Sequence, residues 1–585
     1  MSVPARRPLW FALCVIALAT LLAPLPLRAQ TVPLPGGEAE FEYGDFTGPR
    51  RSDVEWPVGR VNWMLEMNRT VRYLDTWQER DPGPEFGGMI EAESGPLGGV
   101  IQTDNTLEAI WVWSHYRRIT GDTSFDDNIR DAWIYCENWP AWQEESPNYY
   151  RVHNCAWALT AESEYRAATG DTTFLAYGRT SAEYIRNTPL FLNQNQFLNA
   201  MVQGWAAGQL YIYAEELNQA AWRQKALDYG ETMIDWVAVN PARNLSFETW
   251  AMSAGTLAWG ICASVFADDP VRGAQWIAGN GALVDTFQVW YDVPNDGFDW
   301  DNSWNVGYCN AHFAMGEISG DPYYTGIGEK LTRKLNAYDT DDDGGIMATT
   351  QDPPTIDMSW VSSYLAKFGM ARLLGDPPAT DAGLLAFTSP ADGDTFALGT
   401  PIPLRVQATN YGLQALSGVE VAADGLDPAT IDLDFVEVEE VELDPGSLYP
   451  AGRHQITVYT SHPADAVPSN DSLTVTFFVG DPAALGEPVS ERPAILAVQP
   501  NPLISPATIS LAVPAGQTAD VGLFALDGSR LTGWTAEAGQ SRVARFIWDG
   551  RDAAGRPAPA GLYFVRARCG DISVTERIVK LGAPR

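Results

Sequence analysis

The stretch Gln102–Asp122, QTDNTLEAIWVWSHYRRITGD, contains the unit that repeats through most of this chain. It begins with polar residues suited to cap a helix and continues with apolar residues at helical spacing. It ends on Gly121-Asp122, where glycine can adopt the left-handed conformation that closes a helix. The same Gly-Asp ending returns at Gly170, Gly320 and Gly375. The stretch therefore predicts one helix of a recurring helical unit.

The repeat has a regular length. Together with weaker turns near Asn218 and Asp268, the Gly-Asp endings follow one another every 48 to 55 residues. A period of about 50 is typical of stacked supersecondary units. Each period holds a first helical segment with charge on one side and a second one richer in Trp, Ala, Gly and Met. The first segments cover 60–80, 122–140, 172–187, 219–238, 270–288 and 321–337, and the second cover 104–119, 154–169, 196–217, 247–267, 302–319 and 357–374.

These two kinds of helix predict an architecture. Amphipathic helices shield a core from water, whereas helices that are apolar most of the way round are buried. Residues 59–375 are therefore expected to form an (α/α)6 toroid, two concentric rings of six helices. The loops that lead into the inner helices are the longer ones, and all of them emerge at one end. Long loops on a rigid scaffold commonly carry function, so we expect the site at this mouth.

The pattern changes after the toroid. Residues 384–480 contain short alternating runs separated by Gly, Pro, Asp and Asn, which predicts an antiparallel β-sandwich. A Pro/Glu-containing linker over 481–493 leads to a second β-domain over 494–585. The expected fold class is a multidomain chain, an all-α (α/α)6 toroid followed by two all-β immunoglobulin-like sandwich domains.

The amino-terminal segment has the pattern of an export signal. Arg6 and Arg7 supply positive charge, an apolar core follows over 9–23, and 27–29 form a small-residue cleavage site. We expect 1–29 to be a signal peptide, 30–58 a lead-in, and the protein to be secreted or held at the cell surface. No later run is apolar enough for a transmembrane segment. Removal of 1–29 moves the net charge from −36 to −39, which disfavours nucleic acid as a partner.

Acids and tryptophans recur at the starts of the inner helices. Asp301 and Trp304 share the pattern of Asp357 and Trp360, and Asn154 and Trp157 are related to it. Positions three apart lie on one helix face, so each pair is expected to face the mouth. Acids beside aromatic rings suit sugar binding; the alternative is that the acids are helix caps and the tryptophans core. The tryptophans expected to bind substrate are Trp111, Trp157, Trp250, Trp300, Trp304 and Trp360.

Two kinds of catalysis fit the mouth. Glycoside hydrolysis needs two carboxyl groups across the scissile bond, and Asp104 with Asp301 or Asp357 would supply them. Asn105 and Glu108 fit a capping box, which makes Glu108 a structural residue.

The second kind is β-elimination from a uronic acid, for which the loop Tyr149–Asn154 has suitable groups. Tyr150 or His153 would be the base, and Arg151 and Asn154 would neutralise the substrate carboxylate. The alternative is an ordinary polar loop.

A separate acidic segment predicts a metal site. Asp339, Asp341 and Asp343 have the alternate spacing of a calcium loop, but Thr350 stands where an EF-hand needs glutamate. We expect a Ca²⁺ site completed by a carbonyl near Ile346, by Asp352 or by Asp357. The alternative is a solvated acidic turn. No organic cofactor is expected.

Two resemblances add to this interpretation. The helical region resembles the six-hairpin glycosidase superfamily in its hairpins, its Trp-lined mouth and its acids at inner-helix starts. The last domain resembles the immunoglobulin-like C-terminal modules of the flagellar-hook-capping and type IX sorting kind, which implies contact with secretion or cell-surface machinery. The segments that carry this second resemblance are 500–502, 523–531, 548–566 and 577–581.

The combined prediction is a secreted bacterial carbohydrate-active protein whose partner is an oligo- or polysaccharide. A glycoside hydrolase with paired carboxylates is favoured. The alternatives are a polysaccharide lyase and a non-catalytic glycan-binding or scaffold protein.

Overall fold

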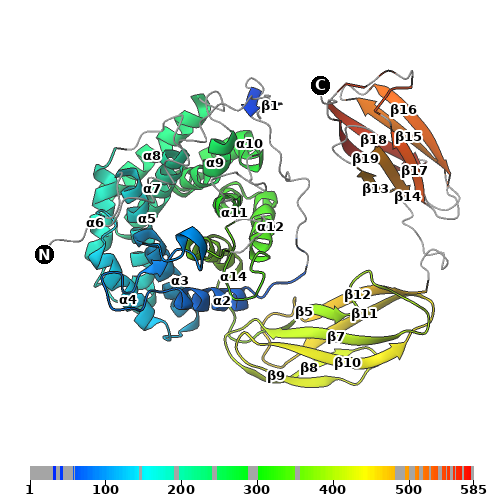
Figure 1. Ribbon diagram of the computed structural model, residues 1–585, viewed down its shortest axis with the longest axis horizontal. Coiled ribbons are helices and arrows are strands. Elements are labelled where there is room, and N and C mark those ends of the chain that lie inside the picture. The colour runs from blue at the N-terminus through cyan, green and yellow to red at the C-terminus, as the bar shows by residue number, and fades with distance from the viewer. Residues whose placement is uncertain are drawn as a thin grey trace.

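A computed structural model gives the structure of the chain (Figure 1). It describes residues 30–33, 40–43, 57, 59–143, 148–189, 197–239, 247–286, 301–348 and 356–480. Beyond residue 493 it describes 494–499, 507–512, 518–525, 529–537, 543–548, 550–553, 556, 558–559, 561–569 and 572–580. A short strand pair, β1 (Gln30–Pro33) and β2 (Glu40–Tyr43), precedes the helical region.

Helices alternate between an outer and an inner position from residue 63 to residue 374. The outer helices are α2 (Trp63–Thr76), α4 (Asp126–Asn138), α6 (Leu175–Asn187), α8 (Ala220–Val239), α10 (Pro270–Thr286) and α12 (Pro322–Asn336). The inner helices are α3 (Thr103–Thr120), α5 (Asn148–Thr169), α7 (Phe197–Glu216), α9 (Phe247–Ile261), α11 (Asp301–Ser319) and α13 (Ser359–Leu365). Helix α9 continues into a π-helical turn, η3 (Cys262–Phe266), and α13 continues through η4 (Ala366–Met370) into α14 (Ala371–Leu374).

The inner helices form a closed ring. Each of them contacts the next along the chain, and α13 contacts α3, so the last inner helix returns to the first. The aromatic core between them includes the fully buried side chains of Trp113, Trp157 and Trp205. Gly121 and Gly170 close their helices at φ 76° and 73°, where a side chain would be strained. The predicted helical toroid is confirmed.

Two inner helices begin at other residues than the sequence predicts. Helix α5 begins at Asn148, so 148–153 are helical and not loop. Pro147 precedes this start and no Gly or Pro follows until Gly170, which favours helix throughout. Helix α13 begins at Ser359 after Met358 as its cap, and Asp357 instead pairs with Met347 in a β-bridge. Asp357 is therefore not a helix cap.

A short excursion precedes α3 and packs on the start of α13. Strands β3 (Met89–Ile90) and β4 (Ile101–Gln102) pair around the 3-10 turn η2 (Gly95–Leu97). The Ser359 N–H donates to the Glu91 carbonyl at 3.0 Å, and the Glu93 N–H donates to the Asp357 carbonyl at 3.3 Å. These bonds tie the first and last inner helices together at one end of the ring.

A β-sandwich follows the toroid. Its strands are β5 (Ala382–Ser389), β6 (Thr395–Phe396), β7 (Pro401–Asn410), β8 (Leu416–Ala423), β9 (Ala429–Leu433), β10 (Val438–Leu448), β11 (Gly452–Ser461) and β12 (Ser472–Val479). They form a sheet of order β10-β7-β5 and a sheet of order β6-β12-β11-β8-β9. Alternate residues along β7, such as Leu404, Val406 and Ala408, are buried in the core, as a half-covered strand requires.

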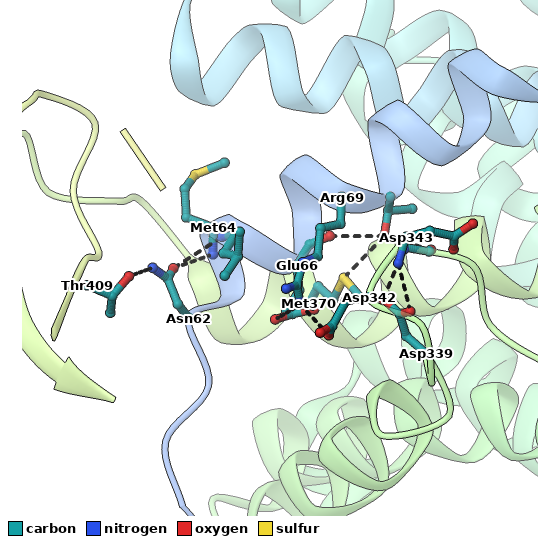
Figure 2. A network of polar contacts seen from close by, with 12 residues as sticks. Asn62, Met64, Glu66, Arg69, Asp339, Asp342, Asp343, Met370 and Thr409 are labelled. Carbon is teal, nitrogen blue, oxygen red and sulfur yellow. Dashed lines mark hydrogen bonds and ion pairs between the residues drawn. The ribbon is translucent and has the colours of Figure 1, made fainter. Parts of the chain in front are cut away.

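Two polar residues join this sandwich to the toroid. The Arg60 guanidinium donates to the carbonyls of Leu384 at 2.9 Å and Ser472 at 2.7 Å. The Asn62 carbonyl oxygen accepts from the first N–H groups of α2, while its amide donates to Thr409 of β7 at 2.9 Å (Figure 2). A single asparagine is thus both a helix cap and a bond between domains.

The final β-region has two sheets among its described residues. Their orders are β13-β14-β17 and β16-β15-β18-β19. The strands are β13 (Ala494–Gln499), β14 (Ala507–Ala512), β15 (Thr518–Ala525), β16 (Arg530–Glu537), β17 (Val543–Trp548), β18 (Gly561–Cys569) and β19 (Ile572–Lys580). Within the described part of the chain, no helix has the length and apolar character to cross a membrane.

Candidate active site

Acidic and polar side chains from separate elements meet at the amino end of the inner ring. We name Glu91, Asp104, Glu108, His153 and Tyr364 the inner acid group. Asp104 and Glu108 share one face of α3, one turn apart, and their carboxylate oxygens lie within 4.8 Å of each other and of a His153 ring nitrogen. All three of these side chains are buried.

Hydrogen bonds order the inner acid group. His153 Nε2 lies 3.3 Å from Tyr364 Oη and 3.7 Å from Asp104 Oδ2. Tyr364 Oη accepts from the Trp157 indole N–H at 3.1 Å and also bonds the Glu108 side chain. The tyrosine therefore joins α13 to both α3 and α5 at the centre of the group.

Burial sets the protonation of the group. Burial of the carboxyl, followed by the nearby Asp104 carboxylate, raises the pKa of Glu91 from 4.5 to about 8. Burial, Asp104 and Glu91 raise the pKa of Glu108 well above its ordinary value. Burial lowers the pKa of His153, and Asp104 opposes that change. At neutral pH Glu91 therefore holds its proton, the change at Glu108 also favours the protonated form, and His153 is neutral.

Aromatic rings surround the inner acid group. Trp157 is 2% exposed and packs against Trp205, Tyr364 and Phe368. Trp111 is 6% exposed, with the Lys367 ammonium 4.2 Å from its ring centroid. Trp157 therefore lies inside the core beside Tyr364, whereas Trp111 lines a cavity between the inner helices together with Lys367. The rings around Tyr364 help to exclude water from the acids, which favours the raised pKa values.

Three further predicted residues lie on α5 and α13. Trp360 keeps part of its surface exposed and meets Tyr364 edge to face, and Arg151 is also partly exposed. The Asn154 side chain is fully buried, and neither its amide nitrogen nor its oxygen has a hydrogen-bond partner among the described residues. Its donor and acceptor are buried without a partner among the described residues, which is unusual for a side-chain amide.

Five further carboxylates form a second cluster, which we name the outer acid group: Glu93, Asp339, Asp341, Asp343 and Asp357. Donor oxygens of Glu93, Asp343 and Asp357 lie within 4.8 Å of one another, and so do those of Asp339, Asp341 and Asp343. Figure 2 shows part of this acidic loop beside α2.

The acids of the outer group act on one another. Burial, then Glu93 and the loop aspartates, raises the pKa of Asp357 to about 8. Burial and neighbouring acids raise the pKa of Asp339 to about 6, although the Gly344 N–H and Arg69 oppose the change. Asp357 thus lies with the predicted metal ligands, and the expected pairing of Asp104 with Asp301 or Asp357 across one bond stays a prediction.

The other predicted residues divide into two sets. Asp104 and His153 come together, and Asp339, Asp341 and Asp343 come together. The side chains of the remaining candidates lie outside the described residues; these are Asp301, Tyr150, Trp250, Trp300 and Trp304.

Glu91, Glu93 and Tyr364 are residues that sequence reasoning missed. Glu91 and Glu93 lie in the short segment EAES, which has no helical or strand period. Glu108 was assigned to a capping box, and this is wrong because α3 begins at Thr103, two residues before Asn105. The signal available for Glu108 was its place four residues after Asp104, which puts both acids on one face.

Comparison with known proteins gives structural neighbours only. No family model matches the chain. No curated protein matches it. An unsaturated glucuronyl hydrolase specific for heparin shares 13% identity over 53% of this chain and 98% of its own, with a TM-score of 0.39. The GH76A α-1,6-mannanase of Salegentibacter sp. HEL1_6 shares 12% identity over 53% and 99%, with a TM-score of 0.36. An unsaturated glucuronyl hydrolase of Bacillus sp. GL1 shares 12% identity over 54% and 97%, with a TM-score of 0.35.

Proposed function

We propose that this chain is an exported carbohydrate-active enzyme that hydrolyses a glycosidic bond of an oligo- or polysaccharide. The observation that carries the proposal is the inner acid group, in which three carboxyls and a histidine from separate elements meet in an aromatic enclosure. Paired carboxyls of opposite protonation are what this hydrolysis requires. The export signal expected over 1–29 supports a location outside the cytoplasm, and the resemblance of the last domain to sorting-type modules supports contact with secretion or surface machinery.

The roles follow from exposure and charge. Glu91 is the acid, because it keeps part of its surface exposed and holds a proton at neutral pH. It gives this proton to the leaving glycosidic oxygen as the bond to the anomeric carbon breaks. Asp104 is the carboxylate that takes up a proton from the attacking water, whose oxygen bonds the anomeric carbon. Glu108 and Tyr364 hold Asp104 and His153 in place.

A lyase is the second candidate. His153 is neutral and lies 3.3 Å from Tyr364 Oη, so the two form a base and a proton relay of the kind that β-elimination needs. Arg151, at the start of α5, would then face the carboxylate of a uronic acid.

One assay separates these activities. The full chain is incubated with a panel of neutral and uronic-acid polysaccharides, and both reducing ends and ultraviolet absorbance are followed. Hydrolysis yields reducing ends without absorbance, because no double bond forms. Ultraviolet absorbance that increases together with the number of reducing ends would show that the enzyme is a lyase and not a hydrolase. If glycans bind but neither signal appears with any polysaccharide of the panel, the protein is a binding protein and both enzyme proposals fail.

A further inference from the structure

We propose that the outer acid group binds Ca²⁺, with Asp343 as the ligand shared by its two halves, and that this ion fixes the segment that carries Glu91. The binding site itself is independent of the proposed hydrolysis. Only the effect on Glu91 rests on the proposed function.

The donor spacing fits calcium. Asp343 belongs both to the set with Glu93 and Asp357 and to the set with Asp339 and Asp341, and the donor oxygens of each set lie within 4.8 Å of one another. Calcium–oxygen bonds of about 2.3–2.6 Å allow two ligands of one ion to lie up to about 5 Å apart. Each set of three can therefore contact one ion without a large rearrangement, and Asp343 is the ligand common to both sets.

A buried hydroxyl provides a second observation. Tyr73, on α2, is 2% exposed, and its Oη has no hydrogen-bond partner among the described residues. Asp357, Glu93 and Asp343 all act electrostatically on this hydroxyl. A phenol next to carboxylates normally donates to one of them, so its unsatisfied oxygen points to a missing neighbour. It is a neutral oxygen donor that can complete the coordination of a cation.

The charge balance also calls for a cation. Arg69 is the basic residue that reaches the acidic loop in the described structure, and it forms ion pairs with Glu66 at 3.2 Å and Asp342 at 2.9 Å. Arg69 and the N–H groups that donate to Asp339 and Asp343 therefore compensate the charge of the outer acid group only in part. Because all donors are oxygens, a hard cation is favoured over zinc or copper. An irregular cage built mainly of carboxylates suits calcium better than magnesium, which keeps more of its waters.

Two glycines keep the cage open. Gly344 has φ 96°, a conformation that disfavours any side chain. A Cβ at Gly345 would lie 2.7 Å from Asp357 Oδ2 and 2.6 Å from the Tyr73 ring. The backbone of the acidic loop therefore lies close to the side chains of Asp357 and Tyr73, where a residue with a side chain would not fit. This leaves space for the carboxylate of Asp357.

The ion would act on the inner acid group through two residues of backbone. Glu93 supplies a ligand, its N–H bonds the Asp357 carbonyl, and Ser359 bonds the Glu91 carbonyl. An ion that holds Glu93 and Asp357 together thus fixes the backbone of Glu91 against α13. Glu93 and Asp357 are positioning residues in this scheme.

Calorimetric titration of the full chain, after removal of metal with EDTA, tests the binding. CaCl2 is expected to bind with a Kd in the micromolar range and to raise Tm by about 5 °C or more at saturation, whereas MgCl2 binds at least about tenfold more weakly. Asp343→Asn is expected to abolish the heat and the Tm rise. Asp342→Asn is the matched control, because this neighbouring exposed aspartate pairs with Arg69 outside the group, and it keeps both responses.

The outcomes are distinct from those of the enzyme assay. If the Asp343→Asn chain does not fold, Glu93→Gln takes its place, and this variant is also expected to lose the heat of calcium binding. Wild-type chain without calcium heat and without a Tm change overturns the site. If Asp343→Asn and Asp342→Asn lose the calcium heat and the Tm rise equally, general charge and not a specific site causes the effect. This result also overturns the site. Calcium binding without any polysaccharide turnover keeps the site and removes only its effect on Glu91.

Discussion

The two acid groups lie on either side of one short segment, yet they differ in what surrounds their carboxyls. Glu91 points to the inner group, where rings and buried backbone surround three carboxyls and a neutral histidine. Glu93, two residues later, points to the outer group, where five carboxylates crowd one another in a loop that includes the exposed Asp341 and Asp343. Burial raises pKa values in both groups, but the outer one gathers more carboxyls beside one another. Residue type alone therefore does not separate a proton donor from a metal ligand.

The largest expected effect is a difference in activity between variants of Glu91 and Glu93, which lie two residues apart on this segment. Glu91→Gln removes the donated proton and is expected to lower kcat by about 100-fold or more. Glu93→Gln loses the calcium that fixes the Glu91 backbone but keeps the donated proton, so it is expected to lower kcat less, by about tenfold. Initial rates of reducing-end release measure both variants, with the exposed Glu137→Gln as control. Equal losses in the two variants would erase the distinction between the groups.

The pH dependence gives the next effect. Glu91 must be protonated to act, so activity is expected to fall as pH rises through about 8. The same raised pKa makes folding favour the protonated form. Its stabilising contribution is therefore fully present below the ordinary pKa of 4.5 and is lost as pH rises through about 8.

Thermal unfolding from pH 5 to pH 9 in EDTA measures the second part of this prediction. Wild-type Tm is expected to fall over this range, and Glu91→Gln is expected to reduce the slope by a few degrees overall. An unchanged slope would show that the carboxyl is solvated and would remove it as the acid.

The smallest effect lies in the outer group without calcium. Asp343→Asn removes one charge from the crowded outer acid group, and after solvent screening it is expected to raise the Tm of the metal-free chain by about 1–2 °C. Asp104→Asn, in the inner group, is expected to gain less, because fewer carboxyls lie beside it. Thermal unfolding in EDTA compares the two. A less stable Asp343→Asn chain would show that this carboxylate is held by its bonds and not strained by its neighbours.

The helices could be predicted because their signal is local. Gly-Asp endings and apolar periodicity recur in each hairpin, and Gly121 and Gly170 adopt the conformation that this pattern requires. Asp104 and His153 could be proposed for the site because polar residues at the starts of inner helices must meet at one end of a ring.

The rest of the site depends on contacts that sequence periodicity does not encode. Ser359 bonds the Glu91 carbonyl across 268 residues of chain, and no local pattern marks either residue. In the sequence, Tyr364 resembles any other aromatic residue of the core. The structure shows its hydroxyl beside His153 and Trp157. The pairing of Asp357 with the loop depends on its β-bridge to Met347, which removed it from the helix start where sequence placed it.

The bond from Asn62 to Thr409 couples helix α2 to the sandwich. Because the same side chain caps α2, a shift of β7 would also disturb the first turn of that helix. Helix α2 also carries Arg69 and Tyr73, which border the outer acid group. The helix against which the sandwich docks is therefore the one that borders the proposed cation site.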